Sequence, residues 1–152
     1  MKTKEQIKEL KDKIAADAAA RKERVDEFYS EAQARRLENE ARLGDIERTH
    51  NVTLGIDMGV VWLPTGHMIV VRRPELLPYD QYQAKGNVAI VKGKSEEMAK
   101  LQDDLLDSGV LLYPTKGELE LLCDTCADAK GEAVNLASHM HDIESKVFEG
   151  KS

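Results

Sequence analysis

The sequence predicts an α+β protein, in which a long N-terminal helix precedes a β-hairpin or three-stranded sheet packed against C-terminal helices. Residues 1–49 are rich in strong helix formers and contain no proline. Residues 51–73 are dense in β-branched side chains and glycines, which is typical of short strands and turns. Residues 74–148 return to apolar side chains at helical spacing. We therefore divide the chain into a charged helix, 1–49, and a small α+β domain, 50–152.

The N-terminal helix is predicted to begin after Thr3, which forms a capping box with Gln6. Apolar residues follow one face of this helix as in a weak coiled-coil seam, interrupted near Arg21 and Lys22. An apolar face this narrow does not stabilise the helix of an isolated monomer. We therefore predict that it binds a partner protein or a second copy. The predicted contact residues are Ile7, Leu10, Ile14, Val25, Phe28 and Ala32. In the alternative, the helix is solvated and packs only through Leu37, Leu43 and Ile46.

The hairpin is predicted over about 58–73, with strands at Val60–Leu63 and His67–Arg72. Between them, Pro64 has a favoured turn position and Gly66 stands where a positive φ is readily adopted. Residues 52–56 are a candidate third strand. Because a hairpin alone is marginally stable, helices from elsewhere must cover its apolar face.

The C-terminal region is predicted to be helical over about 95–107, 115–129 and 132–148, with Gly131 separating the last two helices. A short helix at about 79–84 is expected to end near Gly86. Residues 86–93 are predicted to be either a short strand or a buried helical turn. Residues 110–114 are predicted to be an extended or tightly turned link.

The two cysteines and two of the four histidines have the spacing C-x2-C-x12-H-x-H, which is close to that of a zinc finger. However, His139 and His141 are two residues apart, and helix positions with this spacing point about 200° away from each other. We therefore predict no metal and no cofactor, with Cys123 and Cys126 as buried or half-buried helix residues. The alternative is a small zinc-binding regulatory module that uses Cys123, Cys126 and His139.

Other candidate chemistry is sparse. The chain has no G-x-S-x-G elbow, P-loop or G-x-G-x-x-G motif, so we do not expect an enzyme. Asp57 lies near two glycines and is predicted to be a turn residue, and His67 is predicted to be exposed and structural. Arg72 and Arg73 are a candidate contact for an anion or for the carboxylates of a partner; the alternative is a solvated strand end.

Charge and hydropathy limit the partners and the compartment. The net charge of -6 argues against indiscriminate binding to nucleic-acid phosphates. No apolar run is long enough to span a bilayer, and the first residues lack the apolar core of a signal peptide. We therefore expect protein partners, no membrane and a reducing cytoplasm, where the two cysteines are thiols or ligands.

The order of motifs from about residue 41 onward carries a resemblance. A hairpin ends in two arginines and a proline, and a helix with two tyrosines follows. Later, an apolar helix is followed by a Tyr-Pro pair and then by a helix with a threonine cap. The matching residues are Arg72, Arg73, Pro74, Tyr79, Tyr82, Tyr113, Pro114 and Thr115. This order resembles small tailed-bacteriophage proteins, namely tail assembly chaperones and minor virion components. The resemblance covers about the last two thirds of the chain, and the long charged helix departs from the chaperone pattern.

The resemblance implies a role in assembly and no catalytic residues. It implies a protein that binds phage structural subunits or copies of itself. The implied location is the host cytoplasm during assembly, or the virion itself.

Overall fold

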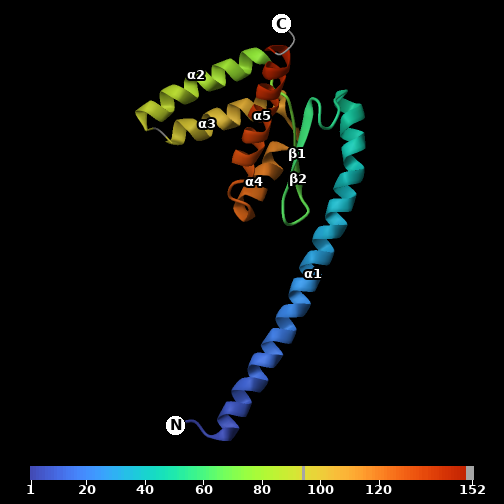
Figure 1. Ribbon diagram of the computed structural model, residues 1–152, viewed down its shortest axis with the longest axis vertical. Helices are drawn as coiled ribbons and strands as arrows, with labels where there is room; N and C mark the ends of the chain where they lie inside the picture. The colour runs from blue at the N-terminus through green and yellow to red at the C-terminus, as the bar shows by residue number, and fades with distance from the viewer. Residues whose placement is uncertain (94, 150–152) are drawn as a thin grey trace.

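The computed structural model describes residues 1–93 and 95–149, and it confirms the predicted α+β fold. A long helix, α1 (Lys4–His50), leads into the hairpin of β1 (Met58–Trp62) and β2 (Met68–Arg72). The paired helices α2 (Leu76–Lys92) and α3 (Ser95–Leu105) follow. Next come a π-helical turn, η1 (Leu106–Val110), and the short strand β3 (Leu111–Tyr113). The chain ends with the helices α4 (Lys116–Thr125) and α5 (Ala129–Glu149). In Figure 1, α1 is a rod that extends far beyond the compact remainder of the chain.

The sheet is antiparallel with the order β1-β2-β3, so β2 is its central strand. Successive side chains of a strand point to opposite faces, and both faces of β2 are apolar. Ile69 and Val71 pack against the C-terminal helices, in a core that includes Leu106 and Leu119. Met68 and Val70 face the other way and pack with Leu43 and Ile46 of α1. The sheet is therefore covered on both faces, by α1 on one side and by the C-terminal helices on the other.

The third strand is not where the sequence placed it. Residues 52–56 form a turn rather than a strand, because Asp57 Oδ1 accepts a hydrogen bond from Thr53 N at 2.6 Å. Gly55 has a positive φ of 89° in this turn. The predicted role of Asp57 as a turn residue is therefore confirmed. The strand that completes the sheet is β3, in the segment that was predicted to be an extended or turned link.

Three helix boundaries also differ from the prediction. Helix α2 runs through Gly86, which is buried against Met98 of α3, and it ends instead at Gly93 with a φ of 68°. Helix α4 ends at Thr125, and α5 begins at Ala129, before Gly131. Burial of Ala129 and Ala133 stabilises the helix on both sides of Gly131. Helix α3 ends at Leu105 instead of about residue 107. The chain continues as η1, in which Gly109 has a φ of 95°.

Candidate functional site

Helix α1 divides into two halves that have different environments. The residues from Ala32 to His50, which we call the anchored half, include every buried residue of the helix. All residues from Lys4 to Glu31, which we call the free half, are exposed. At 1.5 Å per residue the free half is about 40 Å long. Figure 1 shows it as the end of the rod, with no other element beside it.

Hydrogen bonds fix the anchored half to the hairpin turn. Arg35 Nη1 donates to the carbonyl oxygen of Thr65 at 2.6 Å, and Asn39 Nδ2 donates to that of Gly66 at 2.9 Å. Asn39 is 3% exposed, so its amide is one of the polar groups that this contact buries. Such buried amides need partners, and these bonds therefore set the direction in which α1 leaves the domain.

Aromatic contacts fix the same half further along the sheet. The guanidinium of Arg36 lies over the Trp62 ring, 4.5 Å from its centroid. Arg42 Nη1 donates to the Tyr113 hydroxyl at 2.7 Å, so the anchored half contacts both β1 and β3. Because these contacts all lie at or beyond residue 32, they leave the free half without support from the domain.

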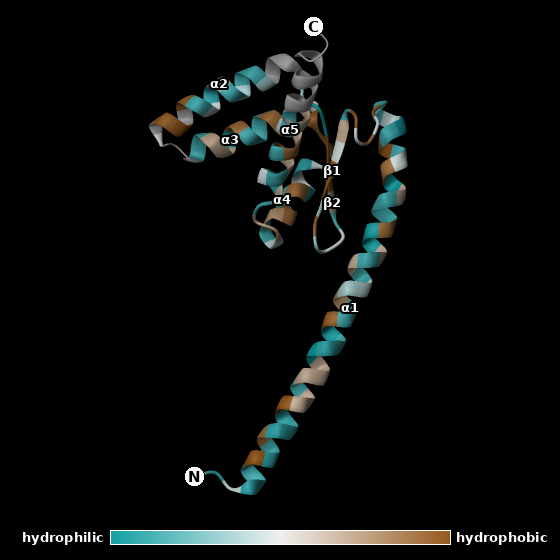
Figure 2. Cartoon of the chain, viewed as in Figure 1, coloured by the Kyte–Doolittle hydropathy of each residue, from teal (hydrophilic) through white to brown (hydrophobic). Residues whose placement is uncertain are grey.

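Five of the six predicted contact residues lie exposed on the free half. The exposed fractions are Ile7 44%, Leu10 43%, Ile14 66%, Val25 44% and Phe28 45%. We call these five side chains the apolar stripe. Bands of apolar residues alternate with polar ones along this part of the helix in Figure 2. Tyr29, which is not among the predicted contact residues, is 65% exposed and packs edge-on against Phe28 with ring centroids 5.6 Å apart.

The sixth predicted contact residue, Ala32, is not available to a partner. It is 8% exposed, and its carbonyl oxygen would lie 2.1 Å from a Cβ added to Gly66. The hairpin turn therefore lies directly on Ala32. The alternative reading named Leu43 and Ile46 correctly as packing residues, but it was wrong about Leu37, which is 60% exposed.

The apolar stripe lies on the same side of α1 as its packed face. Leu10, Phe28 and Ile46 follow one another at intervals of about five helical turns, so they lie on one line along the helix. Ile46 is buried against the sheet. The stripe is thus the continuation of an intramolecular packing face past the point at which the domain ends.

The other predicted contact, Arg72 and Arg73, is separate from the stripe. Arg72 ends β2 and pairs with Met58, at the opposite end of the hairpin from the turn that touches Ala32. The backbone N–H of Arg73 donates to the carbonyl oxygen of Asp57 at 2.9 Å. Both side chains are half-buried. Any ligand at these arginines is therefore bound at a second surface.

The candidate metal ligands do not form a centre within the part of the chain that the structure describes. There, no group of three or more His, Cys, Asp or Glu side chains is able to hold a metal ion. Cys123 and Cys126 are free, half-buried and packed against the core of the C-terminal helices. His139 is exposed on α5. Helix α5 also runs through position 141, but the side chain of His141 lies outside the described residues.

His67 lies beside the contact between α1 and the hairpin. Its Nδ1 is 2.7 Å from the Thr65 hydroxyl, and the ring is half-buried rather than exposed as predicted. Burial, and secondarily the positive charge of Arg35, lower the pKa of His67 below its ordinary value. Both causes favour the neutral ring, which suits a structural role at this contact.

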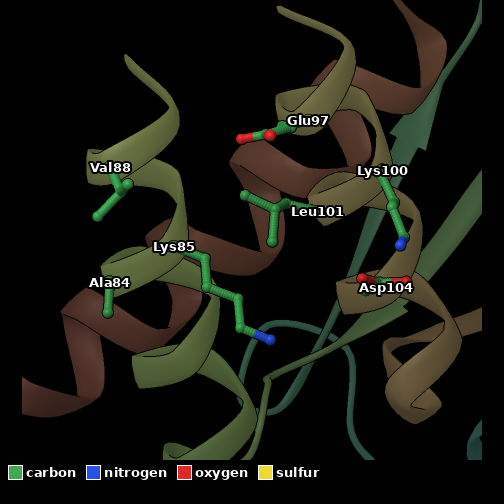
Figure 3. Close-up of a pocket in the computed structure, with 7 residues that line it drawn as sticks. All are labelled: Ala84, Lys85, Val88, Glu97, Lys100, Leu101 and Asp104. Atoms are coloured by element: carbon green, nitrogen blue, oxygen red, sulfur yellow. The ribbon is translucent and has the colours of Figure 1, made fainter. Parts of the chain in front are cut away.

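A surface that the sequence analysis missed lies at the tip of the α2–α3 pair. Val88, Ile90 and Val91 are 51%, 66% and 87% exposed there. Between the two helices is a hollow of about 490 Å³. Its lining, drawn in Figure 3, combines apolar and charged residues: Ala84, Lys85, Val88, Glu97, Lys100, Leu101 and Asp104.

Comparisons with protein-family models, with curated proteins and with solved structures gave no match to this chain. Within the described residues, no helix combines the length and the apolar character that crossing a bilayer requires. The geometry of the chain is therefore the basis for the functional proposal.

Proposed function

We propose that this protein is a non-catalytic interaction protein that binds partner subunits through the free half of α1. The observation that carries the proposal is the apolar stripe, which is exposed on a helix segment about 40 Å long. Apolar anchors at intervals of three, four and seven residues are the recognition pattern of helix-in-groove and helix-pair interfaces. The small domain holds the free half in a fixed direction, because the anchored half of the same helix is bound to the sheet.

The biological setting is proposed from the sequence resemblance alone. In this setting the protein takes part in the assembly of a tailed phage particle, in the host cytoplasm or in the virion. Arg72 and Arg73 are proposed as a second contact, for carboxylates of another subunit. Their distance from the stripe along the hairpin suits a protein that bridges two neighbours.

The proposed function is tested by removing the apolar stripe without shortening the helix. The variant Leu10→Ser with Phe28→Ser is compared with Ala16→Ser with Ala19→Ser, which carries the same number of serines on the opposite side of α1. Proteins retained from a lysate of the source cells are identified for each, and the mass of each variant in solution is measured by light scattering.

We expect the wild type and the control to retain the same partner, or the same oligomeric mass, and the stripe variant to lose it. Loss of one or two buried apolar anchors typically weakens an interface by about 2 kcal/mol or more, which is over tenfold in affinity. If the stripe variant retains the same partners and mass as the wild type, the free half is not the binding element and the proposal is wrong.

A further inference from the structure

The charged residues of the free half are sorted by the side of the helix on which they lie. At about 100° per residue, most basic residues fall within about 90° of the apolar stripe. These are Lys4, Lys11, Lys13, Arg21, Lys22 and Arg24. Most acidic residues fall more than about 125° away, on the back of the helix. These are Glu5, Glu9, Asp12, Glu23, Asp26 and Glu27.

Three residues depart from this pattern. Asp17 and Glu31 lie on the stripe side, and Lys8 lies on the back. The stripe side therefore has six basic and two acidic residues, whereas the back has six acidic residues and one basic residue. Overall the free half is close to neutral, so its composition hides this separation. The surface that a partner meets at the stripe is positively charged.

The positive flanks argue against a pair formed by two copies of the free half. In an antiparallel pair each flank faces the same flank of the second copy, so with Leu10 opposite Val25, Lys11 lies near Lys22 of the second copy and Lys13 near Arg24. In a parallel pair, each flank faces the opposite flank of the second copy, and both flanks are basic. Like charges at the edges of a helix pair destabilise it, so the charge pattern disfavours both arrangements.

The stripe also differs from a helix that lies on a membrane. Interfacial helices bury a broad apolar face in the bilayer. Here the apolar residues form a narrow line, and Asp17 and Arg21 lie within the gap between Ile14 and Val25. Asp17 and Glu31 on the stripe side would be repelled by anionic head groups. A narrow apolar line with charged edges instead matches the side of another helix.

We infer that the free half of α1 binds an amphipathic helix of another protein, whose apolar line is flanked by Asp and Glu. The apolar stripe supplies the contact area, and the flanking lysines and arginines select the acidic partner. Within the described residues no ion pair engages these six basic side chains, so their charges are available to a partner. The inference rests on the proposed function and specifies the chemistry of the partner.

The test uses the full-length protein and two synthetic helical peptides of about 28 residues, matched to the length of the free half. The peptides share one line of Leu and Ile and differ only at the flanking positions, which are Glu in one and Lys in the other. Binding is measured by fluorescence anisotropy at two salt concentrations. We expect the Glu peptide to bind at least about tenfold more tightly, with a preference that weakens as salt screens the charges.

Two charge variants show where the selectivity is located. Reversal of the flanks in Lys11→Glu, Lys13→Glu, Lys22→Glu and Arg24→Glu is expected to invert the preference between the peptides. Reversal of the back in Glu9→Lys, Asp12→Lys, Glu23→Lys and Glu27→Lys is expected to leave the preference for the Glu peptide in place. Circular dichroism establishes that both variants keep the helix content of the wild type.

Four results would overturn the inference: equal binding of the two peptides, binding of neither, dimerisation through the stripe, or tighter binding to vesicles of phosphatidylglycerol and phosphatidylcholine than to the Glu peptide. Its failure is distinct from failure of the proposed function. If the stripe variant loses its partner while the flank variant keeps that partner, binding at the stripe stands and the acidic partner is wrong. If the stripe variant keeps its partner, the proposed function is wrong.

Discussion

At the scale of single residues, the attachment of α1 depends on Gly66. The turn sequence predicted a glycine with positive φ, and its φ is 84°. The structure adds a second requirement, because a Cβ at this position would lie 2.1 Å from the carbonyl oxygen of Ala32. No local pattern contains this contact, since it joins residues more than thirty positions apart.

We predict that Gly66→Ala destabilises the protein far more than Gly55→Ala. Both glycines have similar positive φ, 84° and 89°, so both substitutions carry the backbone penalty of about 1 kcal/mol. Only Gly66 also meets a backbone atom, which raises its expected cost to about 3 kcal/mol. The free energy of unfolding, measured by urea denaturation, checks the difference. Equal losses for the two variants would show that the contact between the turn and α1 is not close in solution.

At the scale of elements, α1 is one helix with two kinds of surface. Its sequence is continuous in propensity, and Thr3 and Gln6 form the predicted capping box in both directions, at 2.9 and 3.3 Å. The same apolar spacing runs through both halves. Periodicity alone therefore could not show that Ala32 faces the domain while Phe28 faces solvent, since the boundary is set by where the hairpin turn ends.

We predict that Leu43→Ala and Leu37→Ala, two identical changes in the same helix, have different costs. Leu43 is 7% exposed and packs against the sheet, so its truncation should lower the free energy of unfolding by about 3 kcal/mol. Leu37 is 60% exposed, and its truncation should cost no more than about 0.5 kcal/mol. Chemical denaturation of both variants measures the contrast. A large loss for Leu37→Ala would mean that this side chain is covered in solution, for example by a second copy.

The other elements show where local signals stop being sufficient. The hairpin and the cap at Thr115, whose hydroxyl oxygen accepts from Glu118 N at 3.3 Å, agree with the sequence analysis. Gly86 and Gly131 are predicted to end or interrupt helices, yet both lie inside them. At Gly131 the burial of Ala129 and Ala133 outweighs the cost of about 1 kcal/mol for a glycine in a helix. Gly86 is itself buried against Met98 of α3.

At the scale of the whole molecule, the protein is a compact domain with a rod attached. The net charge of -6 resides beyond residue 31, since residues 1–31 carry eight basic and eight acidic side chains. A nearly neutral rod with separated faces of opposite charge is thus joined to an acidic domain. This arrangement permits a local attraction to an acidic partner that the overall charge would not suggest.

We predict that removing residues 1–31 leaves the domain folded. Because every one of these residues is exposed, the free energy of unfolding should change by less than about 0.5 kcal/mol. The Stokes radius should fall by more than the loss of mass alone would produce. Removing residues 1–42 is the control, since it also deletes Asn39 and the arginines that bind the turn and β3. If the shorter deletion already unfolds the domain, the free half packs against it in solution.

The sequence by itself determined the α+β class, the extent of the long helix, the hairpin and the residues of the apolar stripe. These features depend on propensity, capping and periodicity, which are properties of neighbouring residues. Only the tertiary structure decided that β3 completes the sheet, that Ala32 is covered and that the stripe begins where the hairpin turn ends. Those outcomes depend on burial between residues distant in the chain, and burial is a property of the packed molecule.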